Sequence, residues 1–433
     1  MEFYLKVRVL VNSWIIYTAF RHFKTKRREK GDTSTILSIV GILSGVMTMI
    51  TVIGVMNGFQ GNNIDKKVEI GSGHIVLEPI DSKATFNPET VSLFPEVDSI
   101  YMSSTNITAS TDIRDGEMMG LQVCSVPDNI LDIDKSFKDM IGLKKGSFDL
   151  SGENTIVIGQ SLSYRLRLNV GDKISLLSLT SHNGNSFEPK EIEFSIVGVY
   201  RSGSLEYDET LAFISNDSAM NHFTKKENFT YKIKIKNRNR YQYTMNKISK
   251  IDGLSSMYSI KSWRDYNTSY YNALKNEKDM MIILIGLIFL VVGVNIYNSL
   301  RRSVYLRFEE ISVLKTMGVS SFDVRVIFIL ESFFIGFIGA TIGVVLGLSI
   351  ANNINAIFDV LEVIINNILS LFNGSSVSLY GSQFFYISKV PVKVFFNECF
   401  MVFIAAIFTS IIAAYGASKR ISSIKPGEVI RNE

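Results

Sequence analysis

The stretch ILSIVGILSGVMTMITVIGVM (36–56) decides the fold class, because it lies in a run from Thr33 to Ile64 without Asp, Glu, Lys or Arg. A helix needs about 20 apolar residues to cross a hydrocarbon core of about 30 Å. Three more uncharged runs cover 280–300, 332–358 and 399–418. We therefore predict an α-helical membrane protein whose four transmembrane helices cover 34–59, 278–300, 326–352 and 396–417.

The composition agrees with a membrane protein and excludes several other classes. Of 433 residues, 46% are hydrophobic and 20% are charged, whereas soluble chains carry about 25% charged residues. A net charge of +4 is too small for a nucleic-acid-binding protein. Two cysteines and four histidines without a CxxC motif indicate neither a disulfide framework nor a metal site. Since GxxxxGK(S/T), HExxH and GxSxG are absent, we expect no catalytic residue, metal or cofactor in this chain.

The uncharged stretch 363–388 is not a span, because it contains several asparagines that would be costly in lipid. The segment before and into it, INAIFDVLEVIINNIL (354–369), has apolar residues at helical spacing. We predict an amphipathic helix on the membrane surface, inside an outer loop over 353–395.

The distribution of Lys and Arg predicts the orientation. Eight of them lie in the first 30 residues, five in 301–325 and four in 418–433, but only two between the third and fourth spans. We therefore expect a cytoplasmic amphipathic N-terminal segment over 1–33, a cytoplasmic segment over 301–325 and a cytoplasmic tail over 418–433.

The outside domain, 60–277, is large and rich in short apolar alternations bounded by Gly, Pro and Asn, which are typical of strands. We predict strands over 74–79, 121–126, 154–159, 172–179, 191–200, 210–214 and 231–236. A helix is predicted over 160–168. The fold class is therefore four transmembrane helices plus a large α+β extracytoplasmic domain between helices 1 and 2.

One predicted hairpin in this domain has a long polar tip. Strands 172–179 and 191–200 flank SHNGNSFEPK (181–190). Such a tip is either a solvated loop or an arm that binds a partner.

The segment RRSVYLRFEEISVLKTMGVSSFDVRVIFIL (301–330) predicts a short helix between two spans. Its charged positions are Arg307, Glu309, Glu310 and Lys315. Its apolar positions are Ile311, Leu314 and Met317. Gly318 ends it, and Ser320, Ser321 and Asp323 can cap the next helix. The helix is either a plain loop helix or one that docks into a groove of a partner protein.

Three motifs resemble those of the FtsX-like, MacB-type permeases of ABC transporters. The motif RFEEISVLKTMGVS (307–320) resembles their coupling helix, and ASKRISSIKPGEVIRNE (417–433) resembles their C-terminal tail. TMITVIGVMNGFQ (48–60) is similar to the first span of the lipoprotein-releasing permeases of the Lol system.

The resemblance implies a transmembrane subunit of an ATP-driven transporter in the bacterial inner membrane. It would extract lipoproteins from the outer leaflet and pass them to a periplasmic lipoprotein carrier. A second permease subunit would complete a homo- or heterodimer, and two copies of a separate ABC ATPase would bind ATP and Mg²⁺. The periplasmic domain would have a porter-like part, 60–120 and 205–275, with a subdomain inserted over 121–204.

The resemblance also assigns roles to residues. Those expected to couple to the ATPase are Arg307, Glu309, Glu310, Leu314, Lys315, Met317 and Gly318. Those expected to line a cleft for acyl chains, between span one of one subunit and span two of its neighbour, are Met47, Ile50, Ile53, Val55, Met56, Phe59, Met281 and Leu284. Those expected to bind the carrier at the hairpin tip are His182, Asn183, Asn185, Phe187 and Pro189.

Two alternatives stay open. A MacB-type efflux or peptide permease would share the coupling helix and the spans, so VMNGFQ (55–60) is the main feature that favours lipoprotein release. An FtsX-like signalling subunit that controls an external hydrolase would have a much smaller outside domain.

Overall fold

A computed structural model describes residues 14–21, 32–80, 87–114, 117–181, 187–225, 228–371 and 389–419. The chain divides into two compact units. The first, called the helical unit, takes its described residues from 14–59, 275–371 and 390–419. The second, called the mixed unit, is centred on 60–274.

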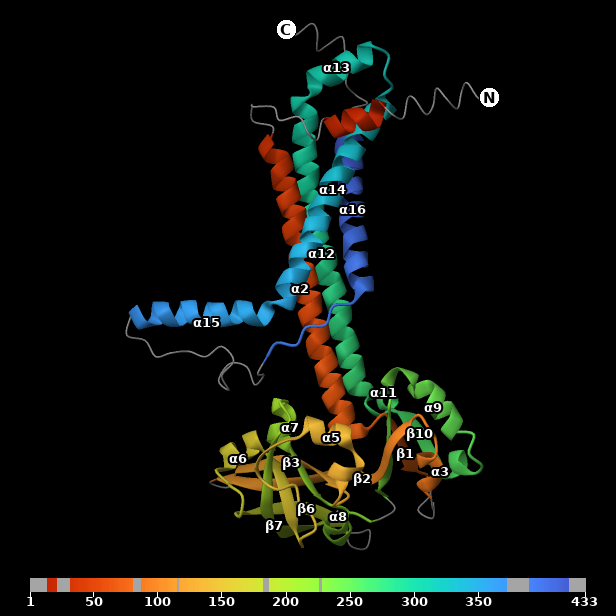
Figure 1. Ribbon diagram of the computed structural model, residues 1–433, viewed down its shortest axis with the longest axis vertical. Coiled ribbons are helices and arrows are strands. Elements are labelled where there is room, and N and C mark those ends of the chain that lie inside the picture. Colours follow the sequence, from red (N-terminus) through yellow and green to blue (C-terminus); the bar gives the residue numbers. More distant parts are fainter. Residues whose placement is uncertain are drawn as a thin grey trace. The chain divides into compact units, whose positions relative to one another are not determined.

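Long apolar helices make up the helical unit, as Figure 1 shows. They are α2 Asp32–Lys66, α12 Thr268–Leu306, α14 Ser321–Asn352, α15 Ile354–Leu371 and α16 Phe396–Ser418. All five are long and apolar enough to cross a membrane, judged by length and composition within the described chain. The prediction of several spanning helices is therefore confirmed. The number four stays a prediction, because α15 also meets these criteria.

Glycines let α14 approach α2 closely. A Cβ atom on Gly343 would lie 2.8 Å from the Val46 Cβ, and one on Gly347 would lie 3.0 Å from the Ile50 Cβ. Both distances are shorter than ordinary carbon contacts, so only glycine fits. Small residues four apart are a common means of packing helices in a membrane, where backbones must come close.

The other long helices complete one bundle. Gly45 of α2 faces Val292 of α12, and Gly336 of α14 faces Ser410 of α16. The Ser332 hydroxyl also donates a hydrogen bond of 2.8 Å to the Ser410 carbonyl. The bundle core consists mainly of Ile42, Val46, Met49, Ile50, Phe289, Val292, Ile296, Ile335, Val402 and Ala406.

The mixed unit is built on a sheet of ten strands. They are β1 Ile75–Pro79, β2 Val97–Arg114, β3 Glu117–Val126, β4 Gly142–Gly146, β5 Thr155–Gly159, β6 Lys173–Ser181, β7 Phe187–Arg201, β8 Leu211–Ser215, β9 Thr230–Ile235 and β10 Tyr258–Ser262. Their order is β10-β1-β9-β2-β3-β8-β5-β7-β4, and β6 pairs with β2 and β7. Because β3–β8 and β5–β7 are parallel while the other pairs are antiparallel, the sheet is mixed.

Short helices cover this sheet (Figure 1). They are α3 Glu89–Ser92, α4 Ile130–Ile133, α5 Lys135–Met140, α6 Gln160–Leu166, α7 Leu205–Thr210, α8 Asn216–His222, α9 Tyr241–Ile248, α10 Leu254–Met257 and α11 Trp263–Tyr266. A 3-10 turn, η3, covers Arg238–Arg240. The last turns that follow α2 form a π-helix, η1, over Lys67–Ser72.

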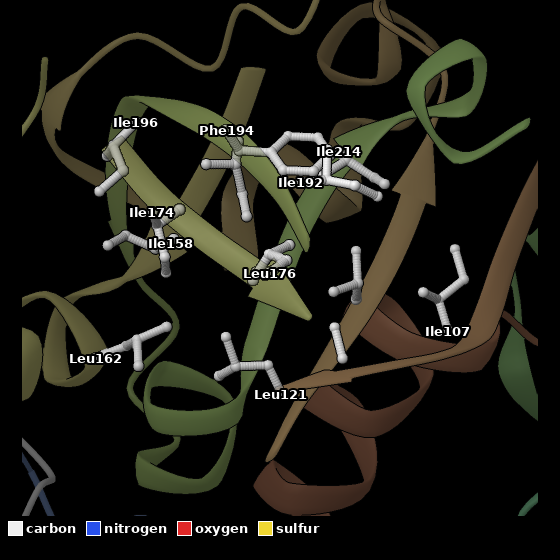
Figure 2. Packing of buried hydrophobic residues seen from close by; sticks show 14 of the residues in the cluster. Ile107, Leu121, Ile158, Leu162, Ile174, Leu176, Ile192, Phe194, Ile196 and Ile214 are labelled. Carbon is white, nitrogen blue, oxygen red and sulfur yellow. The ribbon is translucent and has the colours of Figure 1, made fainter. Parts of the chain in front are cut away.

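The main core of the mixed unit is aliphatic. Figure 2 shows Ile174, Leu176, Ile192 and Phe194 of the β6–β7 pair facing Leu121 and Ile158. Along β3, β6 and β7 the buried side chains alternate with exposed or partly exposed ones, which is the pattern that predicted these strands, whereas all of β5 is buried. Each of the seven predicted strand segments overlaps an observed strand, and the predicted helix 160–168 overlaps α6, so the α+β expectation is confirmed.

The proposed division into a porter-like part and an insertion stays a prediction. β2 pairs with β9 on one side and with β3 on the other. β2 therefore joins the strands of the predicted porter-like part to those of the predicted insertion, and the sheet continues past residue 121 without a break.

Candidate functional site

The segment that resembles a coupling helix forms α13, Phe308–Thr316, between α12 and α14. Its inner side is held by Ile311, which is 2% exposed and packs with Val304, Val324 and Phe328. Gly318 has φ +91°, which ends the helix because other residues rarely adopt this conformation. The Ser320 hydroxyl accepts a hydrogen bond from the Asp323 N–H, so the predicted cap of α14 is confirmed.

The opposite side of α13 combines acidic and apolar groups. Glu309, Val313 and Met317 are four residues apart and therefore lie on one face. Val313 is 55% exposed and Met317 is 75% exposed. Ile311 and Met317 thus do not share a face, although both count as apolar positions of the helix. We call Glu309, Val313 and Met317 the α13 face. Of the other candidates, Glu310, Leu314 and Lys315 are half-buried.

An ion pair joins the start of α13 to α14. The guanidinium Nη2 of Arg307 lies 3.5 Å from Oε1 of Glu331, whose side chain is 1% exposed. Glu331 was not a candidate from the sequence. It could have been identified because it is the only charged residue in the sequence between Arg325 and Asp359. A carboxylate in that setting needs a partner, and here the partner is the residue that begins the candidate coupling helix.

Gly54 and Gly58 of α2 receive a segment of the same chain. We call residues 389–395 the outer segment, after the outer loop that the sequence predicts over 353–395. The Lys393 N–H donates a hydrogen bond of 2.9 Å to the Gly54 carbonyl. A Cβ atom on Gly58 would overlap the carbonyl group of Pro391. The glycines of the motif GVMNG (54–58) therefore allow the outer segment to lie directly on the helix backbone.

Polar groups connect three helices near the same end. The Asn57 amide of α2 donates a hydrogen bond to Oε2 of Glu398 in α16. The Lys278 ammonium of α12 lies 3.0 Å from Oε1 of the same carboxylate. Sequence analysis did not find this group, because its members are far apart in the chain and each is unremarkable in its own run.

The residues expected to line an acyl-chain cleft fall on different faces. Ile50 is buried against Gly347 of α14. Met56 and Phe59 lie on the side of α2 away from Gly54 and Gly58, Val55 lies between the two sides, and all three are partly exposed. Met47 and Ile53 of α2, and Met281 of α12, are also partly exposed, while Leu284 of α12 is exposed. The cleft itself would need a second subunit and stays a prediction.

The predicted hairpin exists as the antiparallel pair of β6 and β7, which starts from Ser181 opposite Phe187. Its candidate tip residues His182, Asn183 and Asn185 lie outside the described residues, as do the side chains of Phe187 and Pro189. Binding of a carrier to this tip stays a prediction.

A buried network of charges holds η1 to the sheet of the mixed unit. The Lys234 ammonium lies 2.6 Å from Oε2 of Glu69 and 3.0 Å from Oδ2 of Asp134. His74 accepts a hydrogen bond at Nδ1 from the Ile235 N–H, and its Nε2 lies 3.5 Å from Oε1 of Glu69. Burial, with the positive charges of Lys234 and Arg238, lowers the pKa of His74 from 6.5 to about 3. Within the described residues, no group of three or more His, Cys, Asp or Glu side chains could hold a metal ion.

Comparisons with known proteins agree with this architecture. The chain is 27% identical to the lipoprotein-releasing system transmembrane protein LolC of Neisseria meningitidis, over 98% of this chain and 99% of that protein. It is 26% identical to LolC of Haemophilus influenzae, over 96% of this chain and 98% of that protein. It is 21% identical to LolE of Haemophilus influenzae, over 91% of this chain and 93% of that protein.

Family models match both halves. The model of the MacB-like periplasmic core domain matches residues 35–251. The model of the FtsX-like permease C-terminal region matches residues 282–426, which include α13, α14 and α16. The chain therefore belongs to the family of FtsX-like permeases that carry a MacB-like periplasmic core domain, and within it resembles the LolC and LolE type.

Proposed function

We propose that this chain is a transmembrane subunit of an ATP-driven ABC transporter that extracts lipoproteins from the outer leaflet of the bacterial inner membrane. The observation that carries the proposal is the similarity to LolC proteins, which extends over 98% of the chain and includes both family regions. The released lipoprotein passes to a periplasmic carrier, for which the β6–β7 hairpin is the candidate contact.

In this proposal, α2, α12, α14 and α16 span the membrane, both termini and α13 lie in the cytoplasm, and α15 lies on the outer surface. The Lys and Arg residues near the spans support the orientation, because they concentrate in 1–30, 301–325 and 418–433. A cysteine placed at Asn185 should react with an impermeant reagent added outside, and one at Ser320 should not. The reverse labelling pattern would contradict the orientation.

Energy would come from a separate ABC ATPase, two copies of which bind ATP and Mg²⁺. The α13 face suits docking into a groove of that ATPase, because its exposed Val313 and Met317 gain from leaving water. Arg307 and Gly318 fix the two ends of the helix. A second permease subunit completes the dimer.

An apolar surface near the outer end of α2 suits acyl chains. Removing an acyl chain from a bilayer costs about 0.8 kcal/mol per CH₂, so release needs both an energy source and a sheltering surface. Val55, Met56 and Phe59 offer such a surface, since Met adapts its shape to varied partners. Met281 and Leu284 of the neighbouring subunit would face them.

Docking of the ATPase is tested by replacing Val313 and Met317 together with Asp. We expect the variant to lose co-purification with the ATPase, because two carboxylates replace the apolar part of the interface. The matched control is Leu93→Asp, which changes an 82% exposed apolar residue of the mixed unit in the same way. Normal co-purification of the double variant would contradict the assignment of α13.

Contact with the substrate is tested with a photoreactive amino acid at Met56, in membranes that contain a radiolabelled triacylated lipoprotein. We expect cross-links to the acyl part at Met56 and none at Ile50, which is buried against α14. Cross-links to an exported drug or peptide, without any to lipoprotein, would favour the efflux alternative.

A further inference from the structure

A cavity of about 320 Å³ lies in the mixed unit beside the π-helix η1. Short π-helical segments occur often at functional sites. The lining residues that matter here are Lys67, Gly71, Cys124, Tyr207 and Lys261. Ser72 and Asn267 line it as well and join η1 to the start of α12 through a hydrogen bond of 3.0 Å from the Asn267 amide to the Ser72 hydroxyl.

Tyr207 places an unsatisfied hydroxyl at this cavity. The residue is 5% exposed, and its hydroxyl has no hydrogen-bond partner among the described residues. The oxygen lies under Gly71, 3.3 Å from where a Cβ of that residue would be. A buried hydroxyl needs a hydrogen-bond partner, so a ligand that accepts or donates a hydrogen bond here would satisfy the Tyr207 hydroxyl.

The cavity wall carries two lysines, Lys67 and Lys261, and one carboxylate, Glu78. The Lys67 ammonium lies 5.4 Å from the ring centres of both Tyr207 and Tyr270, and no described carboxylate lies within 4.0 Å of it. The other lining lysine, Lys261, is already paired with Glu78 at 2.5 Å. Lys67 therefore gives the cavity an uncompensated cation that the ring faces stabilise only in part.

A thiol lies next to these groups. Cys124 lines the cavity and is a free cysteine. Its Sγ lies 3.7 Å from the ammonium of Lys232, which is buried behind it. Burial lowers the pKa of Lys232, and its amine already contacts the Cys124 sulfur, so Lys67 is the cation of this cavity without a described counter-ion.

We propose that this cavity binds a small organic anion, a carboxylate or a phosphate monoester, with its negative group between the Lys67 ammonium and the Tyr207 hydroxyl and its body against Cys124. Both groups can donate hydrogen bonds to such an anion, and hydrogen bonds between charged groups are the stronger ones. The site is separate from the surfaces proposed for lipoprotein and ATPase, and it does not depend on that function.

Cys124 provides a direct test in the full-length protein. Its alkylation rates by iodoacetate, an anion, and by iodoacetamide, its neutral analogue, are measured by mass spectrometry of the Cys124 peptide. In each reaction the thiolate attacks the CH₂ carbon and iodide leaves, so the ratio of the two rates does not depend on the thiolate fraction. We expect the ratio of the iodoacetate rate to the iodoacetamide rate to be about tenfold higher in the folded protein than in the unfolded chain. This factor corresponds to about 1.4 kcal/mol of attraction between the site and the anion.

Variants identify the groups responsible. Lys67→Met should return the ratio to that of the unfolded chain, and Tyr207→Phe should lower it in part. Lys144→Met is the matched control, because it removes an exposed lysine of β4 and should leave the ratio unchanged. An equal ratio in the folded and unfolded protein, an effect of Lys144→Met as large as that of Lys67→Met, or failure of both reagents to reach Cys124 would each overturn the proposal.

Discussion

At the scale of residues, glycines decide how close the helices and the outer segment come to α2. Gly343 and Gly347 bring α14 against α2, and Gly58 brings the Pro391 carbonyl against the same helix. Gly41, also in α2, has no other atom within 4 Å of its Cβ position. The same substitution should therefore be destabilising at Gly58 and nearly neutral at Gly41 of one helix.

Gly58→Ala should destabilise the protein by about 1–3 kcal/mol, because the added methyl group forces the outer segment away from α2. Gly41→Ala should change the stability by less than about 0.5 kcal/mol. The midpoint of thermal unfolding in detergent measures both. Equal midpoints for the two variants would contradict the close packing of the outer segment.

Glu331→Gln should weaken the attachment of α13. Removing one partner of a buried ion pair costs about 3–5 kcal/mol, because the other charge stays buried without its counter-ion. The thermal midpoint should fall, and ATP hydrolysis of the assembled complex should become less dependent on substrate. The control is Glu309→Gln, which changes an exposed residue of α13 and should keep the wild-type midpoint. A midpoint for Glu331→Gln that equals this control would show that the pair does not hold α13.

His74 should make the stability of the mixed unit depend on pH. Its pKa is about 3 in the folded state and 6.5 when unfolded, so acid favours the unfolded state. Above pH 6.5 the titration of His74 does not change the unfolding free energy of the mixed unit. As the pH drops from 6.5 toward 3, it lowers this free energy by about 1.4 kcal/mol per pH unit. Trp263, which is buried in this unit, reports unfolding once Trp14, the other tryptophan, is replaced by Phe.

The comparison is with His74→Gln, whose amide oxygen can still accept from the Ile235 N–H but does not titrate. The difference in unfolding free energy between the two proteins should shrink as the pH falls from 6.5 toward 3. A difference that stays constant over this range would contradict the buried, neutral state of His74.

At the scale of elements, α15 poses the main question of topology. It is as apolar as a span, yet none of its residues is buried. Figure 1 shows it projecting sideways from the end of α14. Asn355 exchanges hydrogen bonds of 3.2 and 2.8 Å with Val390, which keeps the start of α15 beside the outer segment. Five of its six polar positions, 355, 359, 362, 366 and 370, form one stripe at helical spacing, as in helices that lie in a membrane interface, and Asn367 lies beside it.

Spin labels on α15 separate the two topologies. A helix in the interface should give a label at Ile364 high access to oxygen and a label at Asp359, on the polar stripe, high access to a water-soluble nickel complex. A spanning helix would place Asp359 in the hydrocarbon, where a carboxylate costs about 2.5–3.5 kcal/mol. Exclusion of nickel from both labels, with high access to oxygen, would establish a fifth span.

Local patterns in the sequence predicted most elements of this fold. Apolar alternation identified seven strands, and uncharged runs identified the long helices. β4 was not predicted, because all of its side chains are exposed and it carries no alternation. β2 and β10 were not predicted either, since serine and threonine are frequent along β2 and the short β10 has only Tyr258 and Ile260 as apolar residues.

Contacts between distant residues were beyond these patterns. Asn57 and Glu398 are 341 residues apart, and neither stands out in its own segment. The Arg307 candidate was identified by a motif, but its partner Glu331 became evident only when α14 was placed beside α13. Similarly, only the structure shows that the outer segment lies against the glycines of GVMNG.

At the scale of the whole molecule, two helices carry the chain between its units. α2 leaves the helical unit and continues as η1 in the mixed unit, and α12 begins in the mixed unit directly after α11. Each helix is fixed in the mixed unit by polar contacts, which include Glu69–Lys234 for η1 and the Ser72–Asn267 hydrogen bond between them. In the proposed transporter, these two helices would connect the cytoplasmic helix α13 with the periplasmic domain.

Lipoprotein release by the reconstituted complex tests the proposed function most directly. The complex of this chain, its second permease subunit and the ATPase is placed in liposomes with a radiolabelled triacylated lipoprotein, and a periplasmic carrier is added outside. We predict that ATP moves the lipoprotein into the soluble, carrier-bound fraction, and that replacing Val313 and Met317 together with Asp abolishes this release. No ATP-dependent release by the wild-type complex, together with ATP-dependent export of a drug or peptide, would contradict the proposal.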